Sequence, residues 1–322
     1  MHVLLGRIKP FLGLIAVVGV AILVSPEARN GSSIFLDPGN ITDMLRQVSE
    51  IGIIALAMTF VILMAGIDLS VGSVLALSAS ITALVLTRWD PGLGSVLHIG
   101  LAVLLALLAG TAVGIANGFI IARMRIQPFI VTLAAMLGVR GLAKWLTRNT
   151  NIDIGFGDDV SAVFADFASH KVVVIGSFLI LAAVFAFLLS RTVFGRHARA
   201  FGDNPLAARY AGLPVQAIQI KVYGLCGLLA GLAGVIHCAQ THQGSPNAGM
   251  SYELEAIAAV AIGGTSLAGG KGTILGTVIG TLIMGVLTNI LGLNNIDSNI
   301  QMMLKAAIII LAVCLQKTKE AA

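Results

Sequence analysis

The acidic residue best placed to do chemistry is Asp68, which lies between two long apolar runs. Residues 65–73 read AGIDLSVGS, so small and polar residues flank the carboxylate. Ionisable side chains within apolar runs of membrane length are costly and tend to be functional, and interrupted helices recur beside polar pathways. The carboxylate could instead cap the following helix by accepting hydrogen bonds from its free N–H groups. The two roles are compatible, and the sequence leaves both open.

Other motifs that could support catalysis or bind a metal are incomplete. The Gly-Lys-Gly segment at 270–272 lacks the earlier glycine and the following Ser or Thr of a phosphate-binding loop, so we expect this chain not to bind ATP. The Gly-Thr-Ser-Leu-Ala segment at 264–268 lacks the last glycine of a nucleophile elbow. His237, Cys238 and His242 do not have the spacing of a standard zinc site. We therefore predict no enzymatic activity, no metal site and no cofactor.

The composition indicates that most of the chain lies within a lipid membrane. Of its 322 residues, 57% are hydrophobic and 11% are charged, whereas soluble domains carry about 25% charged residues. A spanning helix needs about 20 apolar residues. The sequence predicts an all-α membrane protein with about ten spans in a single domain, 1–322. The predicted segments are 10–25, 48–65, 71–87, 96–121, 128–147, 172–190, 217–237, 253–267, 273–292 and 300–316. The eighth is short and ends in glycine, so it could be re-entrant.

The distribution of Lys and Arg predicts the orientation of these spans. With the N-terminus inside and ten spans, 11 of the 20 basic residues fall in inside segments, 5 fall outside and 4 fall within helices. Because basic residues favour the cytoplasmic side, we predict that both termini are cytoplasmic. The net charge of +5 is then a topology signal. An aromatic content of 6% offers no stacking platform for nucleic acid.

Glycines recur at four-residue spacing within the predicted helices, at 110, 114 and 118 and again at 272, 276 and 280. Small residues at this spacing let helix backbones approach closely in lipid. We expect them to pack helices within the chain, with a contact between two chains as the alternative.

The longest predicted cytoplasmic segment is Arg191–Gln216. Asp203, Asn204 and Pro205 form a helix start signal, which predicts a short helix from Asn204 to Ala211. The arginines of this segment could anchor helix ends at lipid headgroups, or the segment could dock a cytoplasmic partner. The longest outside segment, 148–171, is acidic and could be either a solvated connection or a docking surface.

Four motifs, in order, resemble one family. They are AGIDLSVGS at 65–73; PFIVTL at 128–133 with Arg140 and Gly141; Gly195-Arg196 followed by AFGDN at 200–204 and Ala207-Ala208; and GGTSLAGGKG at 263–272. Together they are similar to the ribose- and galactoside-type sugar permeases, the membrane subunits of ABC importers. The resemblance covers about residues 45–315.

This resemblance implies a fold, partners and a coupling segment. The fold would be the vitamin-B12-permease type of bundle (a type II importer) in a bacterial cytoplasmic (inner) membrane. Two permease chains, often identical, would work with a cytoplasmic ATPase subunit that binds the ATP and with a periplasmic sugar-binding protein. The ATPase-coupling segment would be 195–213. Its residues are Gly195, Arg196, Gly202, Asn204, Ala207, Ala208 and Gly212.

The implied substrate is a monosaccharide, either a ribose-like pentose or a hexose. A sugar needs polar groups that replace its lost water, so polar residues within membrane segments are candidates to line its pathway. These candidates are Asp68, Ser70, Asn117, Gln127 and Asn289. Three alternatives stay open: a branched-chain amino-acid or nucleoside permease of the ABC type, a membrane enzyme acting on lipids and an ion-driven secondary transporter. The enzyme predicts a cluster of His, Asp or Glu at one membrane face, which the sequence does not indicate.

Overall fold

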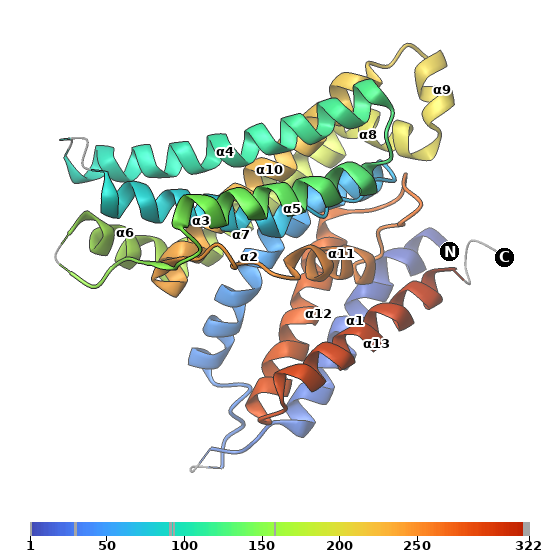
Figure 1. Cartoon of the computed structure of the whole chain (residues 1–322). Coiled ribbons are helices and arrows are strands. Elements are labelled where there is room, and N and C mark those ends of the chain that lie inside the picture. The colour runs from blue at the N-terminus through green and yellow to red at the C-terminus, as the bar shows by residue number, and fades with distance from the viewer. Residues whose placement is uncertain (1, 29–30, 90–91, 93, 158, 318–322) are drawn as a thin grey trace.

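A computed structural model describes residues 2–28, 31–89, 92, 94–157 and 159–317. The described chain is almost entirely helical (Figure 1). The helices are α1 (His2–Val24), α2 (Pro38–Leu63), α3 (Val71–Arg88), α4 (Ser95–Met124), α5 (Pro128–Thr147), α6 (Val160–Ser169), α7 (Lys171–Arg191), α8 (Val193–Asp203), α9 (Pro205–Tyr210), α10 (Val215–Thr241), α11 (Tyr252–Ile262), α12 (Ile274–Leu293) and α13 (Ser298–Lys317). Two short strands, β1 (Ile152–Asp153) and β2 (Gln243–Gly244), pair antiparallel.

Seven helices in the described part of the chain are long and apolar enough to cross a membrane: α2, α3, α4, α5, α7, α10 and α12. Each corresponds to a predicted span, which confirms an all-α membrane protein. The predicted second span started too late, at residue 48. Helix α2 begins ten residues earlier because Asp37 caps its free N–H groups and Pro38 occupies its first turn. The predicted spans that correspond to α1, α11 and α13 are not among the seven.

Helices α2, α3 and α10 are mostly buried, whereas α4, α5 and α7 expose most of their residues. The exposed surfaces of the outer helices are apolar, with residues such as Leu104, Leu137 and Ile180 facing outward. Such an apolar surface is stable in a membrane, because lipid tails are as apolar as the side chains of a protein core. The polar residues of the spans collect inside instead, where protein groups can bond to them.

The glycine series packs helices within the chain, as predicted. A β-carbon on Gly114 would lie 2.2 Å from the Tyr223 carbonyl oxygen, and one on Gly227 would lie 2.1 Å from that of Gly110, so α4 and α10 meet backbone to backbone. Gly276 and Gly280 bring α12 equally close to α11. These contacts need glycine because any side chain would separate the helices.

The predicted eighth span is a short helix preceded by a run of turns. Helix α11 has only 11 residues, and the turn segment 245–251 lies against α3, where Gly249 packs against Gly72. The Arg140 guanidinium on α5 donates to the carbonyl oxygens of Pro246 (3.0 Å) and Ala248 (2.5 Å). Turns leave backbone carbonyl groups without helical partners, and such groups need other donors when they are shielded from water. Arg140 supplies donors to two of these carbonyl groups.

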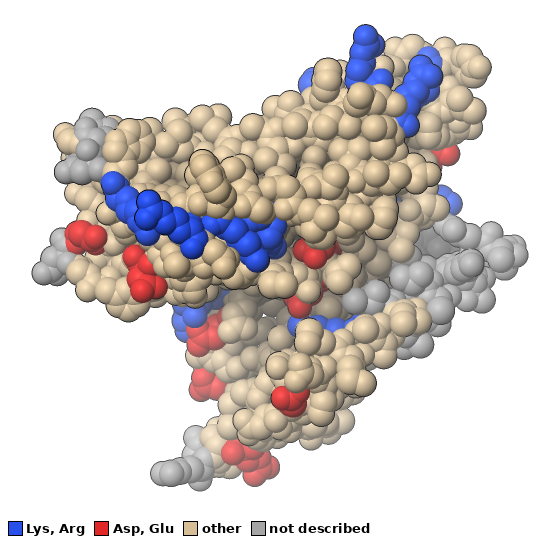
Figure 2. All heavy atoms as spheres, in the orientation of Figure 1, with Lys and Arg blue, Asp and Glu red and all other residues tan. Residues whose placement is uncertain are grey.

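The two ends of the molecule differ in charge. The N-terminal end of α1 and the C-terminal end of α13 lie on the same side as α8 and α9, and α6 lies toward the opposite side (Figure 1). Acidic side chains concentrate toward the side opposite α8 and α9 (Figure 2). Asp159 caps α6 there, and its pKa lies below its usual value because the Ser161 hydroxyl donates to the carboxylate.

Candidate functional site

Asp68, Ser70 and Asn117 form one buried polar cluster between α2, α3 and α4. The Asp68 carboxylate accepts from the Ser70 hydroxyl (2.6 Å) and from the Ser70 backbone N–H (2.9 Å). The Asn117 amide donates to the Ser70 hydroxyl at 3.0 Å. All three residues are at most 3% exposed. The carboxylate therefore bonds to the backbone at the residue that precedes α3, which is close to the predicted capping role.

The other two predicted pathway residues lie elsewhere. Gln127 is exposed in the turn between α4 and α5. Asn289 on α12 exchanges two hydrogen bonds with Asn40 near the start of α2, at 2.8 and 3.1 Å. The five predicted residues thus occupy three separate places. Their role as a pathway lining stays a prediction.

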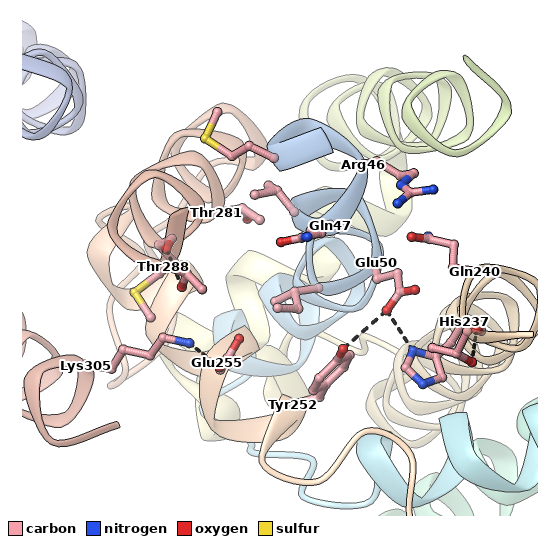
Figure 3. Close-up of a pocket in the computed structure, with 16 residues that line it drawn as sticks. Arg46, Gln47, Glu50, His237, Gln240, Tyr252, Glu255, Thr281, Thr288 and Lys305 are labelled. Atoms are coloured by element: carbon pink, nitrogen blue, oxygen red, sulfur yellow. Dashed lines mark hydrogen bonds and ion pairs between the residues drawn. The ribbon is translucent and has the colours of Figure 1, made fainter. Parts of the chain in front are cut away.

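A group of polar side chains lines a cavity of about 380 Å³. Its walls come from α2, α10, α11, α12 and α13 (Figure 3). Glu50 of α2 is at its centre, where His237 Nδ1 lies 3.0 Å and the Tyr252 hydroxyl 3.3 Å from Glu50 Oε2. The Tyr252 hydroxyl donates to this oxygen, and the His237 ring nitrogen lies within hydrogen-bond distance of it.

A second ion pair crosses the same cavity. Lys305 Nζ of α13 donates to Glu255 Oε1 of α11 at 2.8 Å, with both side chains largely shielded from solvent. The remaining polar lining includes Gln47, Gln240 and Thr288. The cavity therefore offers carboxylate, amide, hydroxyl and cationic groups within one space. Glu50, His237 and Glu255 all line this cavity, from α2, α10 and α11, and the sequence did not predict that they share one space.

This grouping does not form a metal site. Among the described residues, no three His, Cys, Asp or Glu side chains come close enough to hold an ion. His237 bonds to a carboxylate, and His242 lies beyond the end of α10 in a left-handed backbone conformation. The cavity suits hydrogen bonding to a polar ligand rather than coordination.

The predicted coupling segment forms a helical hairpin, α8 and α9. The Asn204 side chain accepts from the N–H groups of Leu206 and Ala207, both at 3.0 Å, and starts α9. The predicted short helix is confirmed, with bounds Pro205–Tyr210. Its end at Gly212, which has φ +75°, also matches the predicted stop. Helix α8 was not predicted, although its buried residues Gly195, Ala198, Phe201 and Gly202 follow a helical period.

One face of this hairpin is buried and the other is free. Gly195, Ala198, Phe201, Gly202 and Ala208 face the protein. Arg196, Asn204, Ala207 and Gly212 are exposed, as are the apolar residues Val193, Leu206 and Tyr210, of which Tyr210 is 89% exposed. The predicted coupling residues thus divide into a packing set and a surface set.

Gly202 makes the closest of these packing contacts. A β-carbon there would lie 1.7 Å from the Leu63 carbonyl oxygen at the end of α2 and 2.6 Å from the Gly270 nitrogen. Gly270 N–H donates to that same Leu63 oxygen at 2.8 Å. The hairpin, the end of α2 and the glycine-rich loop 263–272 therefore meet at one point.

Comparison with known proteins identifies the family. The family model described as "Branched-chain amino acid transport system / permease component" matches residues 40–313. The ribose import permease protein RbsC of Escherichia coli (strain K12) is 40% identical over 316 residues, which cover 97% of this chain and 94% of that protein. RbsC of Bacillus subtilis (strain 168) is 40% identical over 321 residues, covering 98% and 94%. The L-arabinose ABC transporter permease protein AraH of Azospirillum brasilense is 38% identical over 288 residues, covering 87% and 80%. No solved structure matches the chain.

The family match includes all four motifs that carried the resemblance to sugar permeases, and it includes the cavity and the α8–α9 hairpin. The resemblance is confirmed. The relatives are transport subunits, and their similarity extends along nearly the whole chain. The protein therefore belongs to the family of permease components typified by the branched-chain amino acid transport systems.

Proposed function

We propose that this chain is the membrane-spanning permease subunit of an ATP-driven importer for a monosaccharide, a ribose-like pentose or a hexose. The single observation that carries the proposal is about 40% identity, along nearly the full chain, to permeases named for ribose. The family description alone would also fit an amino-acid permease. The individual relatives favour sugars, and AraH, named for arabinose, supports the same choice.

The proposed architecture is one permease domain, 1–322, with ten spans in a bundle of the vitamin-B12-permease type. Helices α1 and α13, together with α11 and the turn segment 245–251 that precedes it, would complete the seven spans already described. Both termini would be cytoplasmic. The two chain ends lie on the same side of the molecule as α8 and α9 (Figure 1). This supports the orientation, because all of these segments were predicted to be inside from their excess of basic residues.

The free face of α8 and α9 is proposed to receive a separate ATPase subunit, which would bind the ATP, so this chain would need no cofactor and would catalyse no reaction. Exposed apolar groups beside basic ones, such as Leu206, Tyr210 and Arg196, support a protein interface. Gly195 and Gly202 would hold the hairpin against the bundle. A force applied to α9 would then reach α2 through Leu63.

The remaining partners are proposed for the opposite face and the lipid-facing sides. A periplasmic sugar-binding protein would dock over 148–171, where Phe156 and Phe167 are exposed near acidic residues. A second, identical permease chain would complete the channel in the bacterial inner membrane. No nucleic acid is expected as a partner. Asp68, Ser70, Asn117, Gln127 and Asn289 stay the proposed pathway residues.

Uptake by the reconstituted complex tests the proposal. The chain, its ATPase and its binding protein are placed in proteoliposomes, and uptake of labelled D-ribose, L-arabinose and leucine is compared with and without Mg-ATP. We expect ATP-dependent uptake of a sugar and none of leucine. Uptake of leucine alone would indicate the amino-acid class. Sugar uptake by the isolated chain along an ion gradient would indicate a secondary transporter.

A further inference from the structure

The cavity between α2, α10, α11, α12 and α13 has hydrogen-bonding capacity that the protein leaves unused. Gln240 Nε2 and Arg46 Nε are buried in its lining and have no hydrogen-bond partner among the described residues. Both hydrogen bonds to Glu50 reach the same oxygen, Oε2, so the carboxylate retains acceptor capacity. Buried donors without partners are rare and need an explanation. A bound polar ligand would provide one.

The charges of the lining select for a neutral ligand. Two carboxylates, Glu50 and Glu255, face two cations, Arg46 and Lys305. Lys305 is paired with Glu255 at 2.8 Å, and Arg46 lies 3.8 Å from Asp43. A polyhydroxylated molecule needs only donors and acceptors, which the lining supplies without a net charge.

The place and size of the cavity also suit a small solute. Its volume of about 380 Å³ falls in the usual range for small-molecule sites, about 300–1,000 Å³. Tyr252 and Glu255 in its wall belong to the first turn of α11, directly after the turn segment 245–251. In transporters, interrupted helices of this kind surround substrate sites near the membrane midplane.

We propose that this cavity holds the monosaccharide during its passage, an inference that rests on the function proposed above. Glu50 accepts a hydrogen bond from a sugar hydroxyl, and the Gln240 amide donates one. The Tyr252 hydroxyl, which already donates to Glu50, accepts another. None of the five residues predicted as the pathway lines this cavity. The affinity of this site for the sugar is low, because a transported solute must leave as readily as it enters.

Two substitutions in the cavity test this site in the reconstituted complex, with D-ribose as the probe. Thr288→Trp fills the cavity from α12. Leu275→Trp is the matched control, because Leu275 lies on the same helix, is 57% exposed and does not line the cavity. Glu50→Gln keeps the side-chain volume and removes the charge. Each variant is assayed for ribose uptake and for ATP hydrolysis stimulated by the binding protein.

We expect Thr288→Trp to lower ribose uptake at least tenfold while stimulated hydrolysis stays within about twofold of wild type, and Leu275→Trp to leave both unchanged. Glu50→Gln should lower uptake about tenfold, the effect of losing one hydrogen bond to a charged group. Uptake by Thr288→Trp and Glu50→Gln at the rate of Leu275→Trp would overturn the site, although the proposed function would stand. If the complex with Thr288→Trp does not assemble, ribose uptake by the Glu50→Gln complex alone tests the site. A wild-type complex that imports no sugar would instead refute the proposed function.

Discussion

Replacing Gly202 by alanine should separate the α8–α9 hairpin from the bundle. The added β-carbon would lie 1.7 Å from the Leu63 carbonyl oxygen, so α8 must move by more than 1 Å. Overpacking of this kind costs about 1–3 kcal/mol. Loss of the 2.8 Å hydrogen bond from Gly270 N–H to Leu63 adds about 1–3 kcal/mol if the groups stay buried. The better helix propensity of alanine returns about 0.5–1 kcal/mol, so the net cost is about 1–5.5 kcal/mol.

Thermal inactivation of the purified permease and its co-purification with the ATPase together measure this effect. We expect Gly202→Ala to inactivate at a lower temperature and to retain less ATPase. Gly176→Ala on α7 is the matched control, because nothing lies within 4 Å of the β-carbon it would add. The Gly176 variant should be as stable as wild type or slightly more so. If both variants inactivate at the same temperature and retain equal ATPase, the close contact at Gly202 does not hold the hairpin in place.

Three further substitutions test separate parts of the molecule. Ala207→Arg adds a bulky charge to the free face of α9 and should weaken ATPase co-purification without preventing membrane insertion; unchanged co-purification and hydrolysis would count against this face as the docking site. Arg140→Leu removes the donor to Pro246 and Ala248, at a cost of about 1–3 kcal/mol for each carbonyl left unpaired, and should increase proteolysis of the segment 245–251; unchanged proteolysis would show that water replaces the guanidinium. Asn117→Ala should lower the inactivation temperature slightly, for a lost bond of about 1 kcal/mol; a drop in uptake much larger than the drop in stability would support its predicted place in the pathway.

Most of the membrane helices could be predicted because their signal is local. Lipid-facing helices such as α4 and α7 are apolar on all sides, and a window of about 20 residues is enough to recognise them. The short helix α9 was also predictable, since Asn204 and Pro205 form its start signal within two residues. Such features depend on neighbours in the sequence and not on the rest of the fold.

The cavity could not be predicted for the opposite reason. Glu50 and His237 are 187 residues apart in the chain, and only the packing of α2 against α10 brings them to 3.0 Å. The sequence places Glu50 at the start of a predicted span and predicts that the Lys305 side chain extends to the membrane surface. Neither position indicates a shared cavity. The turn segment 245–251 could not be predicted either, because two of its carbonyl groups are bonded by Arg140, which lies in another helix.

Helix α2 is continuous between Glu50 in the cavity and Leu63 beneath the hairpin. That interval of 13 residues corresponds to about 20 Å of rigid helix. A tilt applied at one end must therefore appear at the other. By thermodynamic reciprocity, a solute that binds more tightly to one position of Glu50 also changes the affinity of the hairpin end of α2 for the proposed ATPase subunit. Binding of solute in the cavity and binding of the ATPase at the hairpin would then be coupled through α2.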